Sequence, residues 1–357
     1  MAGSSIGQVF RVTTWGESHG EAMGVIIDGC PPNIKISNAD IQIALDIRKP
    51  AQGAYTTNRK EADTAEILSG IFEGKTTGTP IAIMVRNNDA KSSDYEKLRD
   101  IFRPGHGDYS YDQKYGFRDY RGGGRASGRE TVARVAAGAV AEKVIAKAGI
   151  IALAYTKAIG NVIWNDNKIP LSDDILKSVL LCPDDCKTKE MLELLELVKL
   201  ENDSVGGVVE IVVQGCPAGL GEPVFDKLDA DLAKGLMSIG AVKGVEIGAG
   251  FAVAKMRGSK CNDAILQTGF ATNNAGGILA GISNGDTIVV RATCKPIPSI
   301  DKSQSTINKN GESVAINIGG RHDVCVIPRI VPVCEAMVKI ILADHLLRQE
   351  AILSWVK

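Results

Sequence analysis

Apolar and polar positions along the chain form patterns that predict both strands and helices. Runs rich in β-branched residues predict strands at 7–14, 23–27, 65–72, 81–85, 207–213, 242–255 and 287–292. Apolar residues at helical spacing predict helices at 38–49, 128–147, 189–200, 225–237 and 331–354. Ser37 has the form of a helix N-cap, and the stretch from Ser127 to Glu130 has the form of a capping box, S-x-x-E. Pro50 and Gly149 mark helix ends.

Two pairs of segments resemble each other at similar separations. Residues 24–32 ("GVIIDGCPP") resemble residues 209–219 ("VEIVVQGCPAG"), and each is a strand that ends in Gly-Cys-Pro before a helix. Residues 65–70 ("AEILSG") resemble residues 245–250 ("VEIGAG"). Duplication of a strand–helix–strand unit explains both pairs, and chance similarity between glycine-rich strand ends is the alternative. The halves would be about 1–160 and 200–330 of a single domain, 1–357, with a C-terminal helix at 331–354.

One long stretch departs from the pattern of strands and helices. Residues 86–124 are polar except around 98–102, and structureless insertions of this length are usually functional or disordered. The part from Arg103 to Thr131 holds five arginines, seven glycines and four of the seven tyrosines, and no Val, Leu, Ile or Met. Disordered segments are poor in aromatic residues. We therefore expect an ordered binding loop rather than a disordered segment.

Composition limits the class of protein. The chain has 357 residues, of which 44% are hydrophobic, and its formal net charge of −1 gives no bulk attraction to nucleic acid or to an anionic membrane. The sequence has no run of 18 apolar residues, and its first residues lack the basic and apolar regions of a signal peptide, so we expect none. A zinc site at Cys182 and Cys186 would lack a second pair of ligands. We expect a cytoplasmic protein with reduced thiols, and no membrane or nucleic-acid partner.

The arginines of the polar stretch indicate an anionic ligand. They flank glycine-rich backbone that leads into a helix N-terminus, where free N–H groups, the helix dipole and guanidinium groups all favour phosphate. These arginines are Arg103, Arg118, Arg121, Arg125 and Arg129. A solvated basic loop is the alternative, but it needs neither three successive glycines nor a capped helix. The segment at 123–130 is not a nucleotide-binding P-loop, because Arg129 and Glu130 replace the motif's lysine and hydroxyl and no apolar strand precedes it.

Three of the four histidines lie in polar contexts rather than among apolar neighbours. They are His19 in "GESHG", His106 in "RPGHGD" and His322 in "GRHD", whereas His345 lies on the last helix and is expected to be structural or at an interface. A metal site is one interpretation, but no pair of histidines has H-x-x-x-H spacing. General acid–base chemistry suits these histidines better. The segments "NNAGGILAGISNGD" and "KPIPS" (295–299) could together hold a phosphorylated cofactor.

These motifs resemble one known family, the chorismate synthases. The resemblance rests on "GESHG", on the stretch from Arg103 to Thr131, on "AGGILAGISNG" and on "GRHD", in this order and over essentially the whole chain. It implies an α+β fold, a β-α-β sandwich with internal pseudo-duplication, assembled as a homotetramer. It also implies a carbon–oxygen lyase of the shikimate pathway, which converts 5-enolpyruvylshikimate 3-phosphate to chorismate by 1,4-anti elimination of phosphate. The family needs reduced FMN with no net redox change, and NADPH is a candidate source of reduction.

The resemblance also implies roles for particular residues. His19 would donate a proton to the departing phosphate, His106 would protonate or polarise the reduced flavin, and Asp323 would remove the ring proton together with flavin N5. The residues implied in substrate binding are Ser18, Arg48, Arg59, Arg103, Arg129 and Arg321. The residues implied in cofactor binding are Arg125, Ala126, Ser127, Gly240, Ala241, Ala280, Lys295, Pro296, Ile297, Pro298, Ser299 and Arg321. No metal is implied.

The chain departs from the family pattern at three positions. Ala54 stands where the family has a second substrate arginine, and Arg59 is close enough in sequence to compensate. Gly240 replaces an asparagine, and Ala280 replaces a glycine that allows close backbone approach. Two other classes compete with the lyase. A dedicated NAD(P)H-dependent flavin oxidoreductase should carry G-x-G-x-x-G after a strand, which is absent here, and an RNA-binding module would use the Arg/Tyr/Gly stretch.

Overall fold

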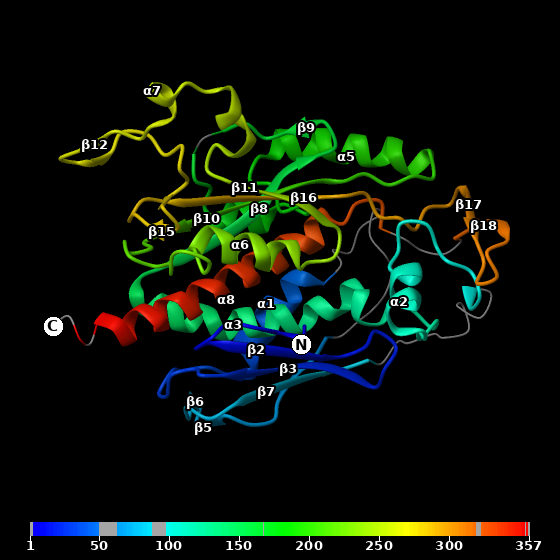
Figure 1. The fold of residues 1–357 in the computed structure, drawn as a ribbon, viewed down its shortest axis with the longest axis horizontal. Helices are drawn as coiled ribbons and strands as arrows, with labels where there is room; N and C mark the ends of the chain where they lie inside the picture. Colours follow the sequence, from blue (N-terminus) through cyan, green and yellow to red (C-terminus); the bar gives the residue numbers. More distant parts are fainter. Residues whose placement is uncertain are drawn as a thin grey trace.

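Two antiparallel sheets enclose a layer of helices (Figure 1). The computed structural model describes residues 3–49, 63–87, 98–166, 168–318, 323–353 and 355. The first sheet has the order β1-β2-β3-β7-β4, formed by Ser5–Ile6, Arg11–Gly16, Ala22–Asp28, Ile81–Arg86 and Ala65–Ile67. The second sheet has the order β11-β16-β10-β8-β9, formed by Val242–Ile247, Ile288–Cys294, Gly207–Gln214, Ile151–Ile159 and Val162–Ile163. The fold is therefore the α+β sandwich that the sequence predicted.

The central layer consists of helices whose apolar faces are covered by both sheets. They are α1 (Asn38–Arg48), α3 (Thr131–Ile145), α6 (Leu228–Met237) and α8 (Ile327–Leu353). Small residues let α3 and α8 approach closely, because a Cβ added to Gly138 would lie 2.4 Å from the Cβ of Ala336. Each sheet turns its buried side chains toward these helices, as the alternating burial along β7 shows. In the described part of the chain, no helix is long and apolar enough to cross a membrane.

The remaining helices and strands lie outside the two large sheets and the central helix layer. The helices are α2 (Asp108–Tyr115), α4 (Ser172–Lys177), α5 (Asp185–Leu200) and α7 (Gly258–Cys261), and 3-10 turns lie at Gly124–Ala126, Gly128–Glu130, Ala146–Ala148 and Gly250–Lys255. The strands pair as hairpins: β5 (Ile71–Phe72) with β6 (Lys75–Thr76), β12 (Ile265–Leu266) with β13 (Gly269–Phe270), β14 (Ile278–Leu279) with β15 (Ile282–Ser283), and β17 (Ser303–Ile307) with β18 (Ser313–Asn317). All eight cysteines are free thiols.

The two sheets repeat one topology. In chain order, β2, β3, α1, β4, the β5–β6 hairpin, β7 and α3 correspond to β8, β10, α6, β11, the β14–β15 hairpin, β16 and α8. The sheet orders correspond as well, since β2-β3-β7-β4 matches β8-β10-β16-β11. This correspondence confirms the predicted pseudo-duplication. The limits 1–160 and 200–330, with a separate helix at 331–354, remain a prediction, and α8 stands in the second unit where α3 stands in the first.

The repeated Gly-Cys-Pro segments have the same local structure in both halves. Thr76 Oγ1 donates to Pro31 O at 2.6 Å, and Ser283 Oγ donates to Pro217 O at 2.6 Å. The same two hydroxyls accept from backbone N–H groups of residues 34 and 220, each at 2.9 Å. Because each strand end is fastened to its own small hairpin by equivalent bonds, the similarity "GCP" reflects a shared turn and not chance.

Several predicted boundaries differ from the structure for physical reasons. The strand predicted at 7–14 starts only at Arg11, because the backbone N–H groups of residues 8–10 turn to a buried carboxylate oxygen of Asp344 on α8. The strand predicted at 242–255 ends at Ile247, because Gly248 and Gly250 adopt positive φ and a 3-10 turn follows. Strand β8 was missed altogether, and α5 and α8 each begin four residues earlier than predicted.

The capping-box prediction at Ser127 is half correct. Ser127 Oγ accepts from the N–H of Arg129 at 3.2 Å, as expected of an N-cap, but it caps a 3-10 turn that leads into α3. Glu130 does not return to the cap. Its carboxylate accepts from Thr14 Oγ1 on β2 and from Arg134 on α3, so tertiary partners replace the local one. At Ser37 the box is complete, with Asp40 as the return partner.

Candidate active site

The long polar segment and the connection after β16 meet at one end of the sandwich, the end at which Figure 1 shows α2 and the β17–β18 hairpin. Phe102 N donates to Ile307 O at 3.2 Å, and Thr306 Oγ1 donates to Phe102 O. The described part of the polar segment, from 98 onward, is therefore ordered against β17. It contains α2, which sequence periodicity missed because the helix buries almost no apolar face and begins and ends at Gly107 and Gly116.

His106 is held between these two connections. Its Nδ1 lies 3.0 Å from Pro104 O, and its Nε2 lies 2.9 Å from Ser299 Oγ. Because a carbonyl only accepts, Nδ1 carries the proton and Nε2 accepts from the Ser299 hydroxyl. Burial, together with the nearby charge of Arg103, lowers the pKa of His106 to about 4. The imidazole is therefore neutral at neutral pH in the ligand-free chain.

Most of the residues implied in cofactor binding surround His106. Lys295 Nζ donates to Gly105 O at 2.7 Å, and Lys295 N donates to Ala241 O at 2.9 Å. A Cβ added to Gly105 would lie 2.6 Å from Pro298, so glycine is required at this approach, where φ is +70°.

Two further close approaches lie beside the group of residues around His106. A Cβ on Gly107 would lie 3.5 Å from the Cβ of Ala126, and a Cβ on Gly240 would lie 3.9 Å from Ala126 O. Small residues therefore line the meeting point of three segments. The 295–299 loop is fixed from behind by Ser204 Oγ, which donates to Ile297 O at 2.6 Å.

Lys295 suits an anion. Burial, followed by the charge of Lys243, lowers the pKa of Lys295 below its usual range. Among the described residues, no carboxylate forms an ion pair with Lys295, so a bound phosphate would relieve the repulsion between the two lysines. The fit to a phosphorylated cofactor is therefore chemical as well as steric.

Two residues of the implied cofactor set lie elsewhere. Arg125 turns toward β2, where its guanidinium donates to Gly16 O at 3.0 Å and Thr14 O at 3.2 Å. Ala280 lies in the β14–β15 turn, beside the start of β16, whereas Lys295 follows the end of β16. Seven residues of strand separate these ends, which is roughly 20 Å. Within one chain, Ala280 is not part of the group around His106.

Ser18 and His19 lie in the β2–β3 turn. Ser18 Oγ lies 3.0 Å from His19 Nδ1. A Cβ on Gly122 would lie 2.2 Å from His19 Nδ1, so His19, like His106, packs against the polar segment, here at its glycine-rich part. Asn87 supports the turn, because its Nδ2 donates to Glu17 O at 3.0 Å and Gly20 O at 2.8 Å.

The three implied substrate arginines that the structure describes, Arg48, Arg103 and Arg129, are each paired with a buried carboxylate. Arg103 binds both oxygens of Asp108, at 2.7 and 2.8 Å, and Arg118 also pairs with Asp108 at 3.3 Å. Burial alone would raise the pKa of Asp108, but the hydrogen bonds and charge of Arg103 outweigh it and leave that pKa below its usual range. Arg48 and Arg129 both pair with Asp63.

Asp323 lies just before α8 and is 7% exposed. Arg329 Nη1 donates to its Oδ2 at 2.8 Å, so the carboxylate is oriented by the first turn of α8. Arg321, His322, Ala54 and Arg59 lie outside the described residues. Sequence reasoning missed Asp63, Asn87, Asp108 and Arg329, because they are acidic or polar partners of the motif arginines and acids and carry no motif of their own.

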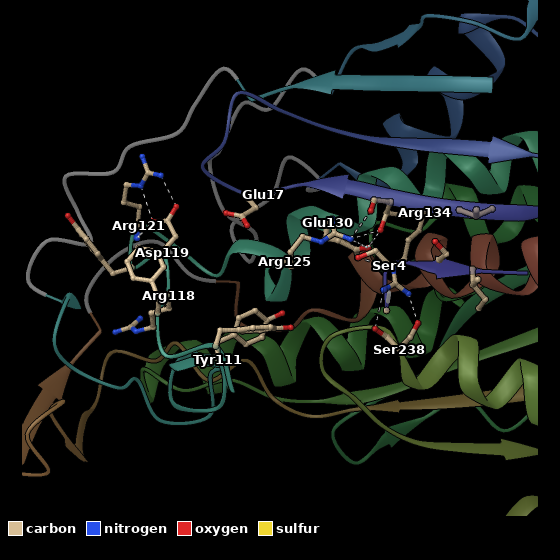
Figure 2. A pocket seen from close by; sticks show the side chains of 18 of the residues that line it. Ser4, Glu17, Tyr111, Arg118, Asp119, Arg121, Arg125, Glu130, Arg134 and Ser238 are labelled. Carbon is tan, nitrogen blue, oxygen red and sulfur yellow. Dashed lines mark hydrogen bonds and ion pairs between the residues drawn. The ribbon is translucent and has the colours of Figure 1, made fainter. Parts of the chain in front are cut away.

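A cavity of about 1130 Å³ adjoins this group of residues (Figure 2). Tyr111 on α2 lines it and also lies against Gly107, while Arg134 and Ser238 line its other end. Seven basic and three acidic side chains line the cavity. This surplus of positive charge favours anions in the cavity beside α2.

The equivalent connections of the two halves bring together arginines, histidines and a loop that contains a lysine. This arrangement is typical of an enzyme that acts on a multiply charged anion. The comparisons with known proteins agree. A family model described as chorismate synthase matches residues 10–347. A chorismate synthase of Syntrophus aciditrophicus (strain SB) is 62% identical, with 99% of each chain covered, and one of Desulfosudis oleivorans is 59% identical, with 100% of each covered.

The fold agrees with these relatives. A solved structure titled "Crystal Structure of Chorismate Synthase" superposes with a TM-score of 0.77 at 33% identity, covering 96% of this chain and 93% of that one. The chain belongs to the chorismate synthase family. It is a carbon–oxygen lyase with the chorismate-forming function of that family, in the shikimate pathway, and the family implies a requirement for reduced flavin.

Proposed function

We propose that the end of the sandwich around His106 is the site where 5-enolpyruvylshikimate 3-phosphate loses phosphate to give chorismate, with reduced FMN as the flavin. The observation that carries this proposal is the convergence of His106, Ala126, Gly240, Ala241 and the 295–299 loop, which are far apart in sequence. In the reaction the allylic C–O bond breaks, phosphate leaves with the electron pair, and a ring C–H bond gives up its proton, so the product gains a double bond without net oxidation.

Arginines would bind the substrate's two carboxylates and its phosphate. Arg103 and Arg129 are the described candidates for direct contact. Arg48 is the third described member of the implied set and is 2% exposed, and Arg59 and Arg321 are proposed on the family resemblance. Ser18 and His19 would lie at the departing phosphate, where a proton from His19 would lower the charge of the leaving group. Asp323, oriented by Arg329, would accept the ring proton.

Reduced FMN would be held by the 295–299 loop, by Gly240 and Ala241, and by Ala126 and Ser127, with Arg125, Arg321 and Ala280 as further candidates. Lys295 and Ser299 would bind its phosphate or ring edge. When bound, the reduced flavin supplies electron density as the C–O bond breaks and recovers it afterwards. His106 is neutral without ligands, so it would hold a second proton only when a negative charge beside it raises its pKa.

The finer properties implied by the family are also part of this proposal. NADPH is proposed as a source of reduction, the homotetramer as the assembly and the cytoplasm as the location. The lining of the cavity beside α2, with its surplus of basic side chains, supports a small anionic partner over a nucleic acid, because the overall net charge is only −1.

An anaerobic assay tests the proposal. Purified protein would receive 5-enolpyruvylshikimate 3-phosphate and chemically reduced FMN, and chorismate would be followed by its absorbance. We expect product formation that requires reduced FMN but consumes none. No product in the presence of bound reduced FMN would contradict the proposed site, and would direct attention to the replacements at Ala54 and Gly240.

A further inference from the structure

A single buried carboxylate joins two of the arginines in the site. The Asp63 side chain has no exposed surface; its Oδ2 accepts from Arg48 Nη1 at 3.1 Å, and its Oδ1 pairs with Arg129 Nη1. Asp63 also has a φ of +42°, in the left-handed region that few residues other than glycine adopt. Backbone strain of this kind persists where the surroundings hold it in place. The aspartate is therefore fixed between two guanidinium groups.

The two arginines differ in exposure. Arg48 is 2% exposed, and its three kinds of nitrogen are all engaged: Nε donates to Thr131 Oγ1, Nη1 to Asp63 and Nη2 to Gly128 O. The Arg129 side chain is 10% exposed, and its Nη2 makes a longer contact of 3.5 Å to Arg86 O. We therefore assign the ligand contact to Arg129, the more exposed of the two, and Arg48 supports the carboxylate from the buried side.

Arg129 is aimed from a second side by Asn87. Arg129 Nε donates to Asn87 Oδ1 at 3.0 Å, and the same Asn87 amide holds the turn that carries Ser18 and His19. One chain of contacts therefore runs from Asp63 through Arg129 and Asn87 to the residues proposed at the leaving phosphate. Two guanidinium groups and one carboxylate leave this cluster with a surplus positive charge at the N-terminus of α3, which favours an anion.

We propose that Asp63 is a positioning residue for substrate binding: it fixes the guanidinium of Arg129, which contacts the anion, and separates it from Arg48. This inference rests on the proposed function in so far as Arg129 is a substrate ligand. Removal of the Asp63 charge leaves two guanidinium groups without their shared partner, and Arg129, the more exposed one, loses its orientation. The expected loss is in substrate affinity and not in the chemical step.

The test uses Asp63→Asn in the full-length protein, with Glu66→Gln as the matched control. Among the described residues, Glu66 forms an ion pair with Arg86 alone, at the surface and at 3.3 Å, so its replacement removes the same charge three residues away. We expect Asp63→Asn to raise the KM for 5-enolpyruvylshikimate 3-phosphate by about 10- to 100-fold, the range for a lost charge-assisted contact, with kcat within about threefold. Glu66→Gln should leave both constants unchanged. An unchanged or lower KM in Asp63→Asn overturns the proposal.

A double-mutant cycle separates positioning from a general structural role. If Asp63 acts through Arg129, the effect of Asp63→Asn on KM should largely vanish in an Arg129→Lys background. The same fold-increase in both backgrounds overturns the proposal. Should Asp63→Asn fail to fold, Asp63→Glu keeps the charge but displaces it, and a KM increase that depends in the same way on Arg129 supports the inference, while a KM equal to wild type contradicts it.

Inorganic phosphate gives a readout that needs no turnover. Its dissociation constant is measured from the rise in unfolding temperature with phosphate concentration. We expect weaker phosphate binding in Asp63→Asn than in wild type and Glu66→Gln. If wild type makes no chorismate but Asp63→Asn still weakens phosphate binding, the proposed function fails and the positioning role stands. If wild type turns over and both variants bind phosphate equally, the positioning role fails alone.

Discussion

Acidification should destabilise this protein through His106, and the size of the effect follows from its environment. Burial and Arg103 lower the pKa of His106 to about 4, against an ordinary value of 6.5. The unfolded chain therefore binds this proton more tightly than the folded chain, and unfolding becomes more favourable as the pH falls from 6.5 toward 4. For a shift of this size, the free energy of unfolding falls by about 2 kcal/mol between pH 7 and pH 5, and by about 3 kcal/mol at pH 4.

Urea unfolding of wild type and His106→Gln at pH 7, 6 and 5 measures this term. Groups other than His106 titrate in both proteins and cancel in the comparison, and pH 5 stays above the range where most carboxylates protonate. We expect wild type to lose about 2 kcal/mol more than His106→Gln over this interval. Parallel pH dependence of the two proteins would refute the reasoning, because it would mean that His106 is not buried beside Arg103 in solution.

Two further predictions concern buried carboxylates away from the site. Asp344→Ala should lower the free energy of unfolding by about 3 kcal/mol, since Asp344 Oδ1 accepts from three backbone N–H groups of residues 8–10, at 2.7–2.9 Å. Asp344→Asn keeps an acceptor and should lower the free energy of unfolding by less than half as much. Equal losses of the two variants in urea unfolding would contradict this. Glu210→Gln should lower the free energy of unfolding by about 3 kcal/mol, because Glu210 is 5% exposed and pairs with Arg291 at 2.6 Å. Tyr155→Phe removes only the hydroxyl that donates to the same carboxylate, so it should lower the free energy of unfolding by about 1 kcal/mol. A larger loss in Tyr155→Phe than in Glu210→Gln would contradict this.

The strands and helices that sequence predicted best are those whose signals are local. Ser37 caps α1 through a complete box with Asp40, and Gly149 ends the α3 region in the left-handed conformation, so both boundaries were predictable from neighbouring residues. The start of β2 was not, because its cause is Asp344, more than 300 residues away. Strand β8 was missed because it follows directly on Gly149 and reads as a continuation of apolar, alanine-rich sequence.

The histidines, the lysine and the arginines of the candidate site were predictable from the sequence, but the carboxylates that pair with the arginines were not. Resemblance identified His106, Lys295 and Arg129 from their motifs. It gave no reason to select Asp63, because a carboxylate that pairs with Arg48 and Arg129 is recognisable only once α1, the segment before β4 and the N-terminus of α3 are in place. Position 280 shows the converse limit: a family motif assigns a residue to a ligand without saying where in the fold of one chain that residue lies.

The duplicated topology explains why the residues of the proposed site meet at this end of the sandwich. The polar segment leads from β7 to α3, and the 295–326 connection leads from β16 to α8, so the two are equivalent connections of the two halves. Because α3 and α8 pack directly on each other, their preceding connections are brought face to face, where Lys295 meets Gly105 and Ser299 meets His106. Each half thus supplies one wall of the proposed site. A ligand bound between the two walls would stabilise the contact of the two halves, so we expect that neither half alone binds the flavin or the substrate.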